Sequence, residues 1–308
     1  MTATLAPPEP APEPAPELPP TPRPQPAPAA PNTPGAGGRR RLLLQLGWAA
    51  TLLAVLLLGF GVYLTAFSGF QEQHFQSTAY KTYRYQLANA TAPTGAAADG
   101  DPVAVLDIPA IGLHQAVVVE GTSGHDLMRG PGHRRDTALP GQRGTAVLFG
   151  RGTAFGAPFD RLSELRVGDK IYATTGQGRF SYTVNAYGDS THPVRDPAAP
   201  ARLVLTTSDA GWIPTGTVLI GARLDGDPQP NPGGRPALTA ADHALAADTG
   251  ALAALQLWAL ALLAAVLAAT LAVRHWHRRA AYLTFAPVLA ALLWAGYENA
   301  AALLPNLY

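Results

Sequence analysis

Hydrophobic residues gather in three long runs, which cover residues 42–67, 250–273 and 280–304. An α-helix rises about 1.5 Å per residue, so roughly 20 apolar residues cross the hydrocarbon core of a membrane, and each run is long enough. A cleavable signal peptide would be shorter and would lie near the start of the chain. The pattern therefore predicts three transmembrane helices, the first of them a signal anchor.

Between the first two runs, from residue 102 to 225, the pattern changes to short apolar stretches separated by turn sequences such as Gly168-Asp169. Regularly spaced short strands with hardly any long helix are typical of a small all-β barrel or sandwich. A short helical segment is expected at 160–165. Strands are predicted at 103–108, 115–119, 144–149, 170–175, 179–186, 201–207 and 217–224.

The remaining segments are polar or rich in proline and alanine. Residues 1–38 consist mostly of Pro, Ala, Glu and Thr, which cannot bury enough apolar surface to fold, so a disordered tail is expected. We favour a plain spacer over a docking ligand for a proline-binding domain. Residues 68–101 suit a juxtamembrane helix, with tyrosines at the membrane interface, followed by a linker. Residues 226–249 are predicted to be a second loose linker.

Two arginine clusters predict the topology. Arg39 to Arg41 precede the first run, and Arg274 to Arg279 separate the last two. Cationic clusters stay on the cytoplasmic side, so the tail and the hairpin loop lie inside while the barrel lies outside a multi-pass membrane protein. Glu298, near the end of the third run, fits the outer rim of the membrane better than a polar contact with another helix, although both remain open.

Composition excludes several classes of function. The formal net charge of +1 argues against a nucleic-acid binder, which needs a basic face. The chain has no cysteine, so it contains neither disulfides nor a thiol nucleophile. The four histidines of the barrel region show no short ligand spacing such as His-x-x-x-His, and its glycine-rich segments lack the strand, lysine and helix of a phosphate-binding loop, so neither a metal nor a cofactor is expected.

The end of the predicted strand 201–207 carries a family resemblance. Leu205-Thr206-Thr207-Ser208 resembles the Leu-x-Thr-x-Cys strand of the sortases, the membrane-anchored transpeptidases of Gram-positive bacteria. The match is nearest to the actinobacterial class E type and implies an eight-stranded β-barrel that acts in anchoring surface proteins to the cell wall. Further similar blocks lie at 107–113, 118–122, 130–133, 137–141 and 156–159.

The resemblance also locates the catalytic positions, and all three are substituted. Ser208 stands at the position of the nucleophilic cysteine, Arg151 at that of the histidine, and Thr217 at that of the arginine. A serine needs a neighbouring base more than a cysteine does, and an arginine cannot accept a proton. The cleft around these positions is expected to include Gly150, Thr206, Thr207, Asp209 and Trp212.

Other residues offer no clear replacement for the missing base. We expect His114, His125, His133 and His192 to be exposed to solvent rather than catalytic. Arg151 is expected to form a structural salt bridge with Asp209.

Three functions remain open. The first is a catalytically degenerate barrel that binds sorting-signal-like peptides or envelope proteins, with further membrane proteins as partners. The second is an active enzyme in which Ser208 is the nucleophile and Arg151 stabilises an oxyanion. The third is a membrane scaffold whose helices are the functional part. The missing base favours the first.

Overall fold

The computed structural model describes residues 36–194, 196, 199–209, 214–275 and 278–308. The predicted disordered tail falls almost entirely outside the described residues, and so does Trp212. Helix α1 (Ala36–Val62) begins slightly before the predicted end of that tail. The chain divides into two compact units, Met1–Leu52 and Leu53–Tyr308, and the contacts described below all lie within the second.

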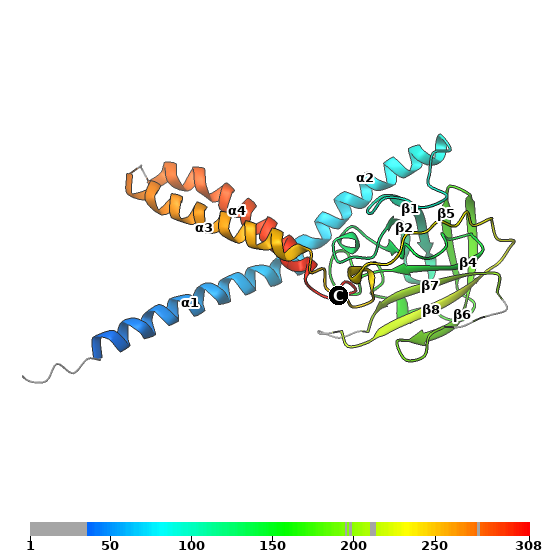
Figure 1. Ribbon diagram of the computed structural model, residues 1–308, viewed down its shortest axis with the longest axis horizontal. Helices are drawn as coiled ribbons and strands as arrows, with labels where there is room; N and C mark the ends of the chain where they lie inside the picture. The colour runs from blue at the N-terminus through cyan, green and yellow to red at the C-terminus, as the bar shows by residue number, and fades with distance from the viewer. Residues whose placement is uncertain (1–35, 195, 197–198, 210–213, 276–277) are drawn as a thin grey trace, which may run out of the picture. The chain divides into compact units, whose positions relative to one another are not determined.

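The predicted all-β domain is a closed eight-stranded barrel (Figure 1), with the strand order β1-β2-β3-β4-β7-β8-β6-β5. The seven predicted strands are present, and β3, which joins β2 to β4, was missed because two residues carry no periodic signal. The predicted helix at 160–165 is a single 3₁₀ turn, Leu162–Glu164. The strands are β1 (Pro102–Ile108), β2 (Leu113–Glu120), β3 (Gly132–His133), β4 (Gly144–Phe149), β5 (Lys170–Thr175), β6 (Gly178–Asp189), β7 (Ala201–Ser208) and β8 (Thr217–Leu224).

Strands β4 and β7 are hydrophobic on both faces, because they separate two hydrophobic clusters. Successive side chains of a strand point to opposite faces, so one set fills the barrel and the other lies on its outer surface. The outer set is nevertheless buried, which means that another part of the chain covers this wall. The inward set includes Ala146, Leu148, Leu203 and Leu205, and the outward set includes Val147, Phe149 and Val204.

A long helix leads to the barrel. Helix α1 continues through a π-helical turn (Tyr63–Phe67) into α2 (Ser68–Ala88). The aromatic residues of α2 were expected at the membrane interface, but Tyr83 is fully buried against the barrel and its hydroxyl donates a 2.7 Å hydrogen bond to the carbonyl of Val103. Tyr85, in contrast, is 71% exposed. Helix α2 is therefore packed on the barrel through one aromatic face.

After the barrel, helices α3 (Ala251–His275) and α4 (Arg278–Ala302) form an antiparallel hairpin (Figure 1). Among the described residues, three helical stretches are long and apolar enough to cross a membrane, one before the barrel and two after it, as predicted. Large apolar side chains on these helices are exposed, for example Leu257 and Leu283. Contiguous exposed apolar surface of this kind is typical of a membrane-facing helix.

Glu298 of α4 contacts another helix. Its carboxylate accepts a 3.0 Å hydrogen bond from the side-chain amide of Gln71 in α2, whose amide oxygen accepts a 2.9 Å bond from the hydroxyl of Tyr63. The less favoured of our two interpretations of Glu298, a polar contact between helices, is thus the one that the structure contains. This network joins the end of the hairpin to the helix that precedes the barrel.

Candidate functional site

The fold brings Ser208, Arg151 and Thr217 to one edge of the barrel. Ser208 ends β7 and lies directly opposite Thr217, the first residue of β8. Strand β4 runs parallel to β7, and Gly150 extends their pairing with a 3.0 Å hydrogen bond from its amide to the carbonyl of Thr206. Arg151 therefore leaves β4 beside the end of β7. Strand ends on a rigid barrel are well suited to present side chains to a cleft.

No base lies beside Ser208 in the part of the chain that the structure describes. Its hydroxyl donates a 2.9 Å hydrogen bond to the main-chain oxygen of Leu307. No His, Asp or Glu side chain among the described residues forms a hydrogen bond with this hydroxyl, and Ser208 as a whole is 7% exposed. A hydroxyl that is bonded to a carbonyl keeps its proton and is a poor nucleophile.

Arg151 is fully buried and binds main-chain carbonyl groups. Its guanidinium donates hydrogen bonds of 3.2, 2.8 and 3.2 Å to the oxygens of Leu127, Gly124 and Tyr308, and it lies over the ring of Phe155 at 4.9 Å. Burial lowers the pKa of Arg151 to about 9, so the side chain is still a cation at neutral pH and cannot act as a general base. It serves instead as a structural donor.

The expected salt bridge between Arg151 and Asp209 is absent, and that prediction was wrong. The carboxylate of Asp209 accepts hydrogen bonds from the amide and the hydroxyl of Thr215, at 3.0 and 3.1 Å, and so braces the turn between β7 and β8. The hydrogen bonds of the Asp209 carboxylate are thus made with Thr215, whereas those of the Arg151 guanidinium are made with main-chain oxygens.

The other predicted cleft residues divide by strand face. Thr206 shares the outward face of β7 with Ser208, because the two residues are two positions apart. Thr207 points the other way, and its buried hydroxyl has no hydrogen-bond partner. Gly152, which was not predicted as a site residue, lies close to Thr207 and Ser208. A Cβ atom at Gly152 would be 3.1 Å from the Ser208 hydroxyl. The missing side chain lets the loop after β4 approach the end of β7.

Residues 303–308, which follow α4, occupy this cleft. The side chain of Leu307 is fully buried in the outer cluster with Val147 and Val204. Its main-chain oxygen accepts a second hydrogen bond, of 3.0 Å, from the amide of Gly152. The side-chain amide of Asn306 donates bonds of 2.7 and 2.9 Å to the carbonyls of Thr122 and His243. The chain itself therefore provides the cover of the outer wall.

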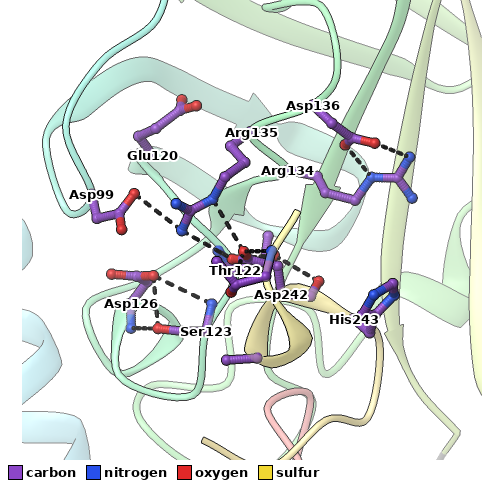
Figure 2. Close-up of polar contacts among 12 residues, drawn as sticks. Asp99, Glu120, Thr122, Ser123, Asp126, Arg134, Arg135, Asp136, Asp242 and His243 are labelled. Carbon is purple, nitrogen blue, oxygen red and sulfur yellow. Dashed lines mark hydrogen bonds and ion pairs between the residues drawn. The ribbon is translucent and has the colours of Figure 1, made fainter. Parts of the chain in front are cut away.

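The segment 226–249, which we expected to be a loose linker, contacts both residues 303–308 and the barrel. Asp242 is fully buried, and its carboxylate forms a 3.1 Å ion pair with Arg135, which also contacts Asp99 at 3.0 Å (Figure 2). The hydroxyl of Thr122 donates a 2.9 Å hydrogen bond to the carbonyl of Asp242. The composition of 226–249 resembles that of a loose linker, but these contacts dock it on the barrel next to residues 303–308.

His133 corrects a further prediction, because it is buried rather than exposed. Its Nδ1 lies 2.8 Å from the carboxylate of Glu120 and its Nε2 lies 2.9 Å from the carbonyl of Ala138. Both ring nitrogens are thus engaged within the barrel wall and neither faces Ser208. The other three histidines, His114, His125 and His192, are exposed as expected. Among the described residues no cluster of three or more metal-ligating side chains occurs.

Comparison with known proteins identifies the family. The sortase domain model matches residues 106–217. Sortase D of Bacillus subtilis (strain 168) is 32% identical over 134 residues, which cover 41% of this chain and 65% of that protein. The solved structure of sortase E from Streptomyces avermitilis is 30% identical, with a TM-score of 0.38. The match covers 46% of this chain and 97% of that one. The chain belongs to the sortase family.

A sortase D5 transpeptidase of Clostridium perfringens is also similar, with 22% identity, a TM-score of 0.42 and coverage of 50% of this chain and 99% of that one. The chain spans 65% of the length of the Bacillus subtilis sortase D, slightly less than two thirds. Because both a sortase D and a sortase E are among the relatives, the class E assignment stays a prediction.

Sequence reasoning missed the occupants of the sortase cleft. Leu307 lies at the end of an apolar run that reads as a continuation of α4, and Asp242 lies in a segment rich in alanine. A signal was nevertheless present, since β4 and β7 are apolar at consecutive positions. An apolar outer face on a barrel strand requires a cover.

Proposed function

We propose that this sortase-family chain is a membrane-anchored, extracytoplasmic binding module that holds an extended peptide of an envelope protein without cleaving it. In this proposal the module takes part in the assembly of surface proteins. Ser208, Arg151 and Thr217 stand where the family resemblance puts its cysteine, histidine and arginine, and no other base is available among the described residues. Substitution of all three roles removes the chemistry of acyl transfer while keeping the groove.

One observation carries the proposal. Every polar contact of Ser208 and Arg151 with residues 307 and 308 is a hydrogen bond to a main-chain oxygen, and Gly152 donates its amide in the same way. Donors aimed at main-chain oxygens recognise an extended peptide largely independently of its sequence, while neighbouring pockets select its side chains. The substituted positions are thus suited to binding a peptide.

The contact between the barrel and residues 303–308 also supports the proposed topology. Because these residues follow α4 directly, the barrel and this end of α4 must lie on the same side of the membrane. The arginines at 39–41 and 274–279 then lie together on the opposite side, where cationic clusters are expected. Both observations favour a barrel outside the cytoplasm, with the tail and the hairpin loop inside.

Impermeant thiol labelling of intact cells tests this topology, because the chain has no cysteine of its own. We expect labelling of His192→Cys, on the exposed barrel surface, and none of Arg279→Cys until the membrane is opened. The reverse pattern would contradict the topology.

The catalytic part of the proposal is tested by mass spectrometry. The full chain in detergent is incubated with sorting-signal peptides and an amine acceptor, and covalent acyl adducts are sought. We expect none. An adduct on Ser208 that is lost in Ser208→Ala would instead establish the second candidate, a serine enzyme whose oxyanion is stabilised by Arg151. Normal envelope assembly by a chain without its barrel would favour the membrane scaffold.

A further inference from the structure

We propose that residues 305–308 are a resident ligand of the cleft, and that the cleft selects peptides carrying an amide side chain followed by an aliphatic one. An envelope peptide with this pair would bind by displacing the resident segment. The inference rests on the proposed peptide-binding function and adds the ligand class and its regulation. Three observations carry it: the pocket of Leu307, the contacts of Asn306, and the space left in the cleft.

The pocket of Leu307 has the character of a specificity site. The leucine belongs to an apolar cluster that includes Leu127, from the turn after β2, Val147 and Phe149 of β4, Val204 of β7, and Leu245 of the segment 226–249. The main-chain oxygen of the same residue is held by two donors from the cleft, the hydroxyl of Ser208 and the amide of Gly152. One residue is therefore recognised by its side chain and its backbone together.

Asn306 is recognised by different chemistry. Its side-chain amide is fully buried and donates to the carbonyls of Thr122 and His243, while its main-chain amide donates 2.9 Å to the carbonyl of Ala246. Carbonyl groups that converge on one point accept an NH₂ group and reject a carboxylate or an apolar side chain. This site thus selects Asn or Gln at the position before the aliphatic residue.

The cleft has no room for a second peptide while the resident segment is bound. The cavity that remains beside Ser208 has a volume of about 210 Å³ and is lined by Gly152, Asp209 and Val218 among others. Pockets that hold a drug-sized ligand measure roughly 300 to 1,000 Å³, so this space admits only a small group. An external peptide must therefore compete with residues 305–308 for the same contacts.

Residues 305–308 follow closely after the end of the membrane hairpin, which has contacts of its own with the rest of the chain. The amide of Asp248, just before α3, donates a 3.1 Å hydrogen bond to the carbonyl of Ala302, the last residue of α4. The loop at Gly124 lies so close to Ala302 that a Cβ atom there would be 2.7 Å from the same carbonyl. Displacing residues 305–308 breaks the hydrogen bonds of Asn306 and Leu307 with the barrel, which follow directly along the chain from these contacts of Ala302.

Accessibility of a single thiol tests the cover. In the full chain in detergent, Ser208→Cys should react with a maleimide slowly, and at least about tenfold faster once Asn306→Ala and Leu307→Asp are added. His192→Cys, which is exposed, should react at the same rate in both backgrounds. Ala173→Cys, inside the barrel, should stay protected in both. Equal rates at position 208 in the two backgrounds would overturn the inference.

Labelling at position 173 also shows whether the barrel stays folded in the double variant. If the double variant exposes position 173 as well, Asn306→Ala alone is used as the milder release. If that variant also opens the barrel, residues 305–308 are part of the fold rather than a displaceable ligand, and the inference fails.

Ligand selection is tested with the amidated peptide Ala-Leu-Leu-Pro-Asn-Leu-Tyr, labelled with fluorescein. We expect it to bind the chain carrying Leu307→Asp at least about tenfold more tightly than the unaltered chain, in which the resident segment competes. Val167→Asp, a matched change at an exposed valine, should bind like the unaltered chain. Peptides with Asn replaced by Ala, or Leu by Asp, should lose at least about tenfold in affinity.

The outcomes separate this inference from the proposed function. If the released chain binds envelope peptides that lack the amide and aliphatic pair as tightly as those that carry it, the selection rule fails and peptide binding stands. A covalent adduct on Ser208 refutes non-catalytic binding, but it leaves the thiol-labelling result, and thus the resident segment, unaffected.

Discussion

The hydroxyl of Ser208 donates a 2.9 Å hydrogen bond to the main-chain oxygen of Leu307, 99 positions further along the chain. The bond joins the residue that we propose to replace the sortase cysteine to a segment that follows the last membrane helix. Its direction matters, because Ser208 gives its hydrogen to a carbonyl instead of losing it to a base. The hydroxyl of Ser208 and the amide of Gly152 are thus both satisfied by one main-chain oxygen.

Ser208→Ala should have a small effect. The oxygen of Leu307 keeps its bond from Gly152, so we expect a loss of about 1 kcal/mol in the free energy of unfolding and nearly unchanged function. Chemical denaturation of the full chain in detergent measures the loss, with Ser190→Ala at an exposed serine as the control. A loss of biological function at unchanged stability would show that the hydroxyl acts chemically.

Ser208→Cys alone should not create a transpeptidase. The thiol would still lack an imidazole, because position 151 is an arginine, and an arginine partner, because position 217 is a threonine. Groups that act as a unit contribute in a strongly non-additive way, so activity should be sought in the triple change with Arg151→His and Thr217→Arg. Thioester formation on the single variant, detected by mass spectrometry, would contradict this expectation.

Arg151→Met should be strongly destabilising. Removing the guanidinium leaves the buried carbonyls of Leu127 and Gly124 and the part-buried main-chain oxygen of Tyr308 without this donor, and each unsatisfied buried polar group costs about 1 to 3 kcal/mol. We expect a loss of about 3 kcal/mol or more by chemical denaturation. Arg166→Met, at an exposed arginine, should change stability by less than about 0.5 kcal/mol. Similar effects of the two changes would refute the structural role of Arg151.

The barrel could be predicted from the sequence because its information is local. Short apolar stretches bounded by turn residues mark seven of the eight strands, and only β3, with two residues, lacks such a signal. The membrane helices are equally clear from length and composition. Ser208 and Thr217 lie opposite each other at the ends of β7 and β8, and Arg151 follows β4, the parallel neighbour of β7; that these are the catalytic positions of the family stays a prediction.

The errors concern contacts between distant parts of the chain. His133 was expected to be exposed, but pairing of β2 with β3 places it against Glu120. Asp242 lies 120 positions from Thr122, its buried partner. Neither contact leaves a periodic pattern in the sequence. A buried polar group is satisfied by whatever the fold brings near, which local propensity does not encode.

Helix α2 provides a comparison within one helix. Tyr83→Ala should cost about 3 to 5 kcal/mol, because it removes a large buried ring and the donor to the carbonyl of Val103. Tyr85→Ala, two residues away and 71% exposed, should change the free energy of unfolding by less than about 0.5 kcal/mol. Thermal and chemical unfolding in detergent would show the difference. If both changes cost the same, α2 is not packed on the barrel through Tyr83.

The docking of the segment 226–249 should depend on pH through Asp242 (Figure 2). Burial by itself raises the pKa of this carboxyl, but hydrogen bonds from Thr239 and Thr122 and the charge of Arg135 outweigh burial and hold the pKa below its ordinary value. A group whose pKa is lowered by folding stabilises the fold above its unfolded pKa, which is about 3.9 for Asp, and loses that contribution as the pH falls through the folded pKa.

The measurement compares the unaltered chain with Asp242→Asn between pH 7 and pH 3. At neutral pH the variant should be less stable, because Arg135 loses a charged partner and Thr239 a strong acceptor. Below pH 4 the difference in unfolding free energy should narrow, since a protonated carboxyl and an amide carry the same charge. Asp227→Asn, at an exposed carboxylate without a hydrogen bond or ion pair among the described residues, is the control and should leave stability unchanged. A difference between Asp242→Asn and the unaltered chain that stays constant down to pH 3 would mean that the charge of Asp242 does not hold the segment on the barrel.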